Sequence, residues 1–310
     1  MALSRRLNIP AAHFILPAFF FFLCAAEGCS FKHLAVRGTA EVLEDGVAAF
    51  EAEPDVTLAH EAAASQMKLL EALHRADPAN REVILSLAKT FGSYTFAFLE
   101  RAAETDPVMR ARAAALYHRG AAYGLDLLEL RLGKGTAESA RTGTFEAWGA
   151  RLARARIGDV PALFWTAYAW GNEIRKSAQS PASVAALPRV VAMMERVLEL
   201  QPAYHFGAAH LFMGVYYSER PRLVGGDPKK AQAHFTKGVD VSEGRFVMAK
   251  YLWARFGAVQ TQDSKLFNSL LKDVIDSPAE LLPQQRLSQE IARGWAQLLK
   301  TEKSKYFAED

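Results

Sequence analysis

Cysteine is scarce in this sequence, and its scarcity limits how the fold can be held together. The 310 residues contain two cysteines, Cys24 and Cys29. Cys24 lies in an apolar N-terminal stretch that we expect to be removed on export, so Cys29 would be the only thiol of the mature chain. One thiol cannot form an internal disulfide, and an unpaired exposed thiol is unfavourable in an exported protein unless it is modified.

An excess of charge of either sign is also missing. The sequence has 37 lysine and arginine residues against 34 aspartate and glutamate residues, a formal net charge of +3. Removing residues 1–28, which hold two arginines and one glutamate, leaves 35 minus 33, or +2. Nucleic-acid-binding proteins gather about 6 to 10 phosphate-contacting cations on one face, whereas basic and acidic residues alternate here. The composition therefore argues against nucleic acid as a partner.

Motifs for catalysis or for cofactor and metal binding are absent as well. His60-Glu61 begins like a zinc-protease motif, but no histidine follows four residues after His60. Residues 133–136 resemble part of a phosphate-binding loop, yet the required glycine five positions earlier is missing. His205 and His210 are five residues apart, so they point to different sides of a helix, and we expect both to be interfacial histidines with their hydrogen bonds satisfied. The sequence predicts no enzyme, no metal and no cofactor.

The N-terminus has the pattern of an export signal. Two arginines precede an apolar run from Phe14 to Ala26, which is about half the length needed to span a bilayer. Small residues at the third and first positions before Cys29 are typical of a bacterial lipoprotein signal, although Glu27 departs from that pattern. We expect Cys29 to be lipidated; the alternative is cleavage nearby by ordinary signal peptidase. Ser30 in place of aspartate favours the outer over the inner membrane.

The rest of the chain has helical periodicity throughout and no segment with period two. We expect one all-α domain over residues 56–310, a solenoid of about eleven or twelve antiparallel helices resembling tetratricopeptide repeats. Residues 29–55 are expected to be a tether with a first short helix. The expected helices cover residues 56–75, 81–101, 107–132, a short segment after Thr144, a segment from about 161, one opened by Pro188, and then 245–260, 263–275 and 283–300, with a loop at 133–143.

Residues 200–242 form the clearest unit of this pattern. Apolar residues recur at helical spacing from Ala208 to Tyr216, and a second helix is expected to begin at the N-cap Asp227. Gly214 in the first helix and Phe235 in the second fit a loose tetratricopeptide pattern, in which small residues let paired helices approach closely. The intervening turn is about five residues longer than in a standard repeat, which indicates a contact surface.

The stretch PAYHFGAAH…G…YY…RP…LVGGDPKKAQAHF within this unit resembles the T-component family of tripartite ATP-independent periplasmic (TRAP) transporters, the TatT family of periplasmic lipoproteins. Three further blocks agree: MKLLEALHRADPAN at 67–80, LYHRGAAYGLDLL at 116–128 and LFWTAYAWGNEI at 163–174. The resemblance implies a non-enzymatic, membrane-tethered periplasmic protein that associates with the solute-binding component of a TRAP transporter. It also implies a hydrophobic ligand and a homotrimer. The alternative is a general tetratricopeptide lipoprotein scaffold that binds peptides or envelope proteins.

Several residues are candidates for a cleft that contacts ligand or partner. Trp165 and Trp170 are separated by about 140° on one helix, so one can pack while the other lines the groove. The glycine turn before Asp227 is either a plain helix start or part of the cleft. Arg119 beside Tyr123 is either a structural ion pair or a cleft residue. The complete candidate set is Arg119, Tyr123, Trp165, Trp170, Tyr204, His205, Tyr217, Arg220, Arg222, Gly225, Gly226 and Asp227.

Overall fold

The computed structural model describes residues 38–39, 46–177 and 180–307, and within these ranges the chain is helical without strands. The predicted lipidation site, Cys29, lies outside the described residues. After a helical segment at residues 46–51, the α-helices are α2 (Val56–Ala76), α3 (Arg81–Tyr94), α4 (Ala102–Thr105), α5 (Pro107–Leu132), α6 (Thr136–Arg141), α7 (Phe145–Leu152), α8 (Val160–Lys176), α9 (Pro181–Leu200), α10 (Tyr204–Ser218), α11 (Pro228–Val241), α12 (Val247–Leu252), α13 (Ser264–Ile275) and α14 (Arg286–Thr301). The all-α prediction is confirmed.

Side-chain caps start several of these helices where the sequence predicted them. The Asp106 carboxylate accepts hydrogen bonds from the backbone N–H groups of Val108 and Met109 at the start of α5. Thr144 caps α7, and Asp227 caps α11 with proline at the first helical position. These contacts satisfy backbone donors that the first turn leaves free. Local chemistry therefore determines where these helices begin.

Two local predictions were wrong. Pro188 does not open a helix: it lies inside α9, which begins at Pro181 after the N-cap Ser180. The stretch 133–143 is not wholly a loop, because it contains the short helix α6. Glu129 explains the second error, since its carboxylate accepts hydrogen bonds from the backbone N–H groups of Gly135 and Ala137 at 2.6 and 2.8 Å.

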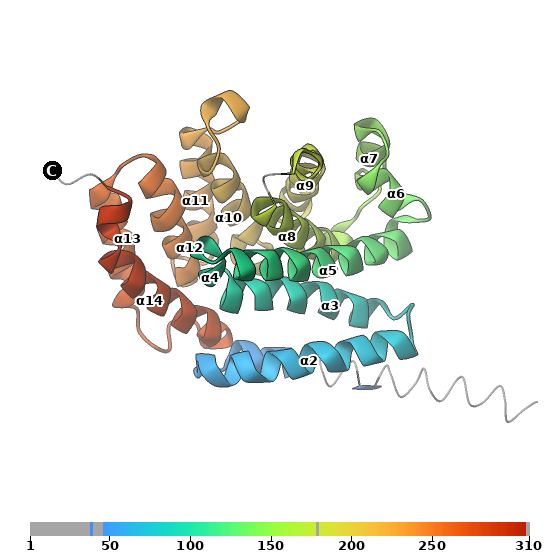
Figure 1. Cartoon of the computed structure of the whole chain (residues 1–310), viewed down its shortest axis with the longest axis horizontal. Coiled ribbons are helices and arrows are strands. Elements are labelled where there is room, and N and C mark those ends of the chain that lie inside the picture. The colour runs from blue at the N-terminus through green and yellow to red at the C-terminus, as the bar shows by residue number, and fades with distance from the viewer. Residues whose placement is uncertain (1–37, 40–45, 178–179, 308–310) are drawn as a thin grey trace, which may run out of the picture.

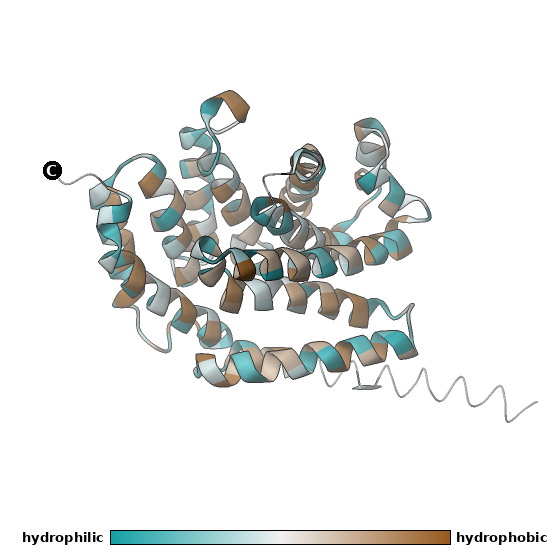
Figure 2. Ribbon diagram, viewed as in Figure 1, coloured by the Kyte–Doolittle hydropathy of each residue, from teal (hydrophilic) through white to brown (hydrophobic). Residues whose placement is uncertain are grey.

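Successive helices pack side by side, and the array curves until its two ends meet (Figure 1). Helix α2 packs on α3, α3 on α5, α5 on α8, and α8 on α9, and the sequence of contacts continues through α10 and α11 to α13 and α14. Helix α14 then contacts α2. The last helix is strongly amphipathic, as its alternating colours in Figure 2 indicate, and it buries Ile291 and Leu299. The array therefore closes around an interior space.

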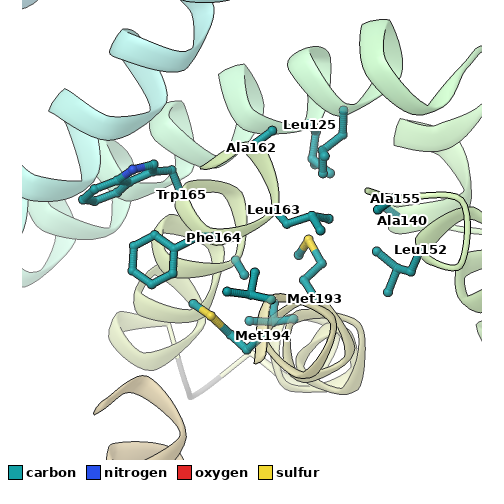
Figure 3. Packing of buried hydrophobic residues seen from close by; sticks show 14 of the residues in the cluster. Leu125, Ala140, Leu152, Ala155, Ala162, Leu163, Phe164, Trp165, Met193 and Met194 are labelled. Carbon is teal, nitrogen blue, oxygen red and sulfur yellow. The ribbon is translucent and has the colours of Figure 1, made fainter. Parts of the chain in front are cut away.

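Glycines permit the closest helix contacts. A Cβ atom on Gly214 would lie 2.8 Å from the ring of Phe235, which is shorter than ordinary van der Waals contact. This confirms the close approach of α10 and α11 that the sequence predicted. Figure 3 shows a second contact region, where Leu163 of α8 and Met193 of α9 meet in the core.

Among the helices of the described ranges, none combines the length and apolarity needed to cross a bilayer.

Candidate functional site

A cavity of about 770 Å³ lies inside the closed array. Its volume is within the range of roughly 300–1,000 Å³ that small-molecule sites occupy. Most of the lining side chains are aromatic or aliphatic; the aromatic ones include Phe96, Phe164, Trp165, Tyr168, Phe212, Phe246, Phe256 and Trp295. Such a lining favours an apolar molecule because each ring offers a large area that is released from water on binding.

Helix α10 contributes part of the cavity lining. Ala208, Phe212 and Val215 of this helix line the cavity, and they recur every three or four positions. That spacing places them on one face of the helix. His205 lies before this regular stretch, among the non-helical residues 205–207, and Glu219 follows the last residue of α10; both also line the cavity.

Aromatic rings surround His205, one of the lining residues. Its ring centroid lies 5.3 Å from that of Trp165 and 6.0 Å from that of Phe164. No hydrogen bond joins the imidazole to another residue of the described ranges, and the side chain is half-buried. Burial, together with the nearby positive charge of Lys89, lowers the pKa of His205 to about 4. The ring is therefore uncharged at neutral pH.

A buried ion-pair network forms another part of the cavity wall. Glu100, which is 5% exposed, pairs with Arg175 and with Lys176, the latter at 2.8 Å. The hydroxyl of Tyr117 donates to the same carboxylate at 3.1 Å. Although burial opposes it, the charges of Arg175 and Lys176 hold the pKa of Glu100 below its ordinary value. Arg175 also pairs with Glu219 at 3.2 Å, so this wall is charged but compensated.

Two π-helical segments contribute to the lining. The segment η2 (Thr95–Leu99) continues α3 and supplies Phe96 and Phe98. The segment η5 (Trp253–Ala258) continues α12 and supplies Arg255 and Phe256. π-Helical turns are rare and occur frequently at functional sites. Their location on both sides of one cavity agrees with a binding role for this space.

Three members of the sequence-predicted set line the cavity: Trp165, His205 and Arg220. Trp170 packs instead against the hydrophobic core around α8 and α9. Tyr204 is not among the lining residues, but its hydroxyl accepts a hydrogen bond from the indole N–H of the lining residue Trp165 at 3.2 Å.

Arg119 and Tyr123 lie outside the lining, on α5. Both bind the same carboxylate, that of Glu71 on α2, and the Tyr123 hydroxyl donates to it at 3.1 Å. The Arg119 guanidinium also lies 4.3 Å from the centroid of the Phe91 ring. These contacts connect two neighbouring helices.

The predicted turn residues lie between α10 and α11. Gly225 has φ of +96°, a conformation that favours glycine. Asp227 donates its backbone N–H to the Tyr217 carbonyl at 3.1 Å, which closes the turn. Arg222 begins the 3₁₀ turn η4 (Arg222–Val224). At Gly226, a Cβ atom would lie 1.9 Å from the Arg220 carbonyl oxygen, so only glycine fits.

Other important lining residues were missed. Tyr168 and Phe212 had the same helical spacing as core residues, so no sequence signal distinguished them. The pairing of Glu100 with Arg175 spans 75 residues, and nothing local in the sequence indicates it. In the described part of the chain, no group of three or more histidine, cysteine, aspartate or glutamate residues could hold a metal ion.

Comparison with known proteins identifies the family to which this chain belongs. The chain is 28% identical over 235 residues to an uncharacterized protein of Treponema pallidum (strain Nichols), and the similarity covers 69% of this chain and 72% of that protein. A model of the family described as "TRAP transporter T-component" matches residues 52–307. This range contains helices α2 to α14 and nearly all of the cavity lining. The chain therefore belongs to the TRAP transporter T-component family.

Proposed function

We propose that this protein takes up a hydrophobic molecule in its interior cavity and works with the periplasmic solute-binding component of a TRAP transporter. Membership of the family supports the association with a TRAP transporter. The proposal of a hydrophobic ligand is supported by the cavity of about 770 Å³ and its aromatic lining. T-components are accessory proteins of transporters and not an enzyme family, which agrees with a role in ligand handling.

We further propose that the chain is exported, lipidated at Cys29 and held at a membrane, with the outer membrane favoured. Acyl chains contribute about 0.8 kcal/mol per buried methylene, so two or three would keep the protein attached while the helical domain stays in the periplasm. A homotrimer is part of the same proposal. Mass spectrometry of the N-terminal peptide tests the acylation, and replacement of Cys29 by Ser provides the control.

The lining favours a small molecule over the alternative of a peptide scaffold. A peptide groove presents free polar side chains to hold backbone groups, whereas here Asn172 already donates to the Tyr168 carbonyl at 2.9 Å. The cavity-lining Lys89 likewise pairs with Glu51 at 2.7 Å. These polar side chains are engaged within the fold.

Sedimentation of the chain, alone and with the solute-binding protein of its own transporter, tests the association. A trimer that takes up this protein, but not the binding protein of an unrelated transporter, is the expected result. A monomer that binds neither protein would contradict the association. It would favour the alternative, a scaffold that binds peptides. Organic extraction of the purified protein followed by mass spectrometry would show whether an apolar molecule occupies the cavity.

A further inference from the structure

His205 lines the cavity at the non-helical start of α10. The ring lies 5.3 Å from Trp165 and 6.4 Å from Phe246, measured between centroids, and these neighbours offer it apolar surfaces. Within the described ranges, no donor or acceptor of the protein is bonded to either ring nitrogen. The side chain is half-buried, so a molecule in the cavity can reach ring nitrogens that the protein leaves without partners and can supply their hydrogen bonds.

The backbone that carries this ring is strained. His205, Phe206 and Gly207 have φ of 46°, 57° and 75°, so three successive residues adopt the left-handed conformation. Residues with a Cβ atom disfavour this conformation, and it persists only where the surrounding structure enforces it, often at binding sites. The result of the turn is visible in its contacts: Phe206 stacks on Phe246 at 5.2 Å, and His205 is left facing the cavity.

The charged residues of the lining already have counter-charges. Lys89 pairs with Glu51 at 2.7 Å. Arg255 lies 3.5 Å from Glu104. At the ion-pair network, Arg175 binds two carboxylates. Arg101 is likewise paired, with Glu302 outside the lining, at 3.0 Å. An anionic ligand would have to disrupt one of these pairs, and leaving a buried charge without its partner is strongly unfavourable.

Arg220 is the remaining cation of the described lining, and it lies beyond the far end of α10 from His205. Its guanidinium stacks on the Tyr216 ring at 3.9 Å and donates to the Tyr216 carbonyl at 3.0 Å. Burial lowers the pKa of Arg220. An acidic head group would therefore bind here and not at His205, which gives the alternative a distinct location.

We propose that His205 is the polar recognition point of the cavity and that the ligand is an uncharged, mostly apolar molecule bearing a hydroxyl or carbonyl oxygen at one end. The inference rests on the proposed uptake of a hydrophobic molecule and names its chemical class. An uncharged imidazole offers one donor and one acceptor, which matches a hydroxyl group. Lys89 and Glu51 are the charged groups nearest to the ring, and they neutralise each other.

Photolabelling of the full chain tests this proposal. The chain is purified from membranes, kept soluble in an amphipathic polymer, and exposed at neutral pH to dodecanol or dodecanoate carrying a diazirine in the tail. We expect dodecanol to label cavity-lining peptides with an affinity about tenfold higher than that of dodecanoate, because the alcohol gains a hydrogen bond to His205 whereas the carboxylate loses its hydration. Competition with unlabelled dodecanol establishes saturable binding.

Variants locate the polar contact. His205→Phe removes both ring nitrogens, and we expect it to weaken dodecanol labelling about tenfold. His205→Asn keeps a donor and an acceptor, and asparagine tolerates the left-handed conformation, so it should retain much of the binding. Arg222→Gln, in η4 outside the lining, should leave dodecanol labelling unchanged, and Arg220→Gln tests where an acid would bind. Trp170→Phe, packed against the core, is the control for a change of aromatic residue outside the lining.

The outcomes separate this inference from the proposed function. Tighter labelling by dodecanoate that is lost in Arg220→Gln would overturn the inference, because the recognised group would be an acid bound at Arg220. Equal labelling of the wild-type chain by alcohol and acid would overturn it too, even if the His205 variants fail to fold. Absence of saturable labelling by either compound would contradict the proposed function itself.

Discussion

The indole N–H of Trp165 on α8 donates a hydrogen bond to the hydroxyl of Tyr204 at the start of α10, across 3.2 Å. The two residues are 39 positions apart in the sequence. Their bond connects the helices that form one wall of the cavity, immediately beside the strained turn that carries His205. The position of the Trp165 ring in the cavity wall therefore depends on the position of Tyr204.

Filling the cavity should prevent ligand binding without unfolding the protein. Ala208 on α10 lines the cavity. We expect Ala208→Phe to weaken dodecanol labelling by roughly tenfold or more, because the added ring occupies the space of the ligand. Ala150→Phe, at an exposed position of α7, is the matched control. Undiminished labelling of the Ala208 variant would show that the ligand binds elsewhere.

The contact between α10 and α11 should be sensitive to a single methyl group. A Cβ atom on Gly214 would lie 2.8 Å from the Phe235 ring, so Gly214→Ala should cost about 1–3 kcal/mol of stability through overpacking. A Cβ atom on Gly294 in α14 would meet no neighbouring atom within 4 Å. Gly294→Ala should therefore stabilise the protein by about 0.5–1 kcal/mol, since alanine favours helix. Urea denaturation followed by circular dichroism measures both changes.

Removing the charge of Glu100 should be among the most destabilising single changes. Glu100→Gln would leave Arg175 and Lys176 near each other without their shared carboxylate. Breaking a buried pair in this way costs about 3–5 kcal/mol. The comparison is Asp276→Asn, which breaks the exposed pair with Lys272 and should leave the denaturation midpoint unchanged. Equal midpoints for the two variants would mean that the buried network contributes little.

Acid should destabilise the protein between about pH 6.5 and pH 4. His210 and His234 face each other with 3.0 Å between their Nδ1 atoms. Burial, then the positive field of His234 and Lys237, lowers the pKa of His210 from 6.5 to about 4. In this pH window the unfolded chain binds a proton that the folded chain does not, so the free energy of unfolding falls as pH falls, by at most about 3 kcal/mol for this residue.

His210→Gln should reduce this dependence on pH, measured as denaturation midpoints across the window. Part of it should persist, because the pKa of His205 is also lowered, to about 4. Ala150→Gln, at an exposed position of α7 that carries no titratable group, is the control and should retain the wild-type slope. A slope unaffected by the His210 change would show that this pair does not titrate as described.

Much of the helical pattern could be predicted because it depends on neighbours in the sequence. Apolar spacing, the caps Asp106 and Asp227, and the small residue at Gly214 all act within one helix or between adjacent ones. Pro188 was misjudged because proline is only a local signal, and the packing of α9 tolerates it inside the helix. The sequence blocks at 67–80, 116–128, 163–174 and 200–242 likewise indicated the family, since each block is a short local pattern that can be read without the structure.

The site depended on contacts that no local pattern encodes. Trp165 and Trp170 have the same residue type, and only the packing of α8 decided that Trp165 is buried and lines the cavity while Trp170 packs, half-buried, against the outside of the core. The sequence alone determined that the chain is helical, where most helices begin, and to which family it belongs, because these follow from short-range spacing and caps. The tertiary structure decided that α14 meets α2 and that His205 faces the enclosed space, because closure joins residues far apart in the chain.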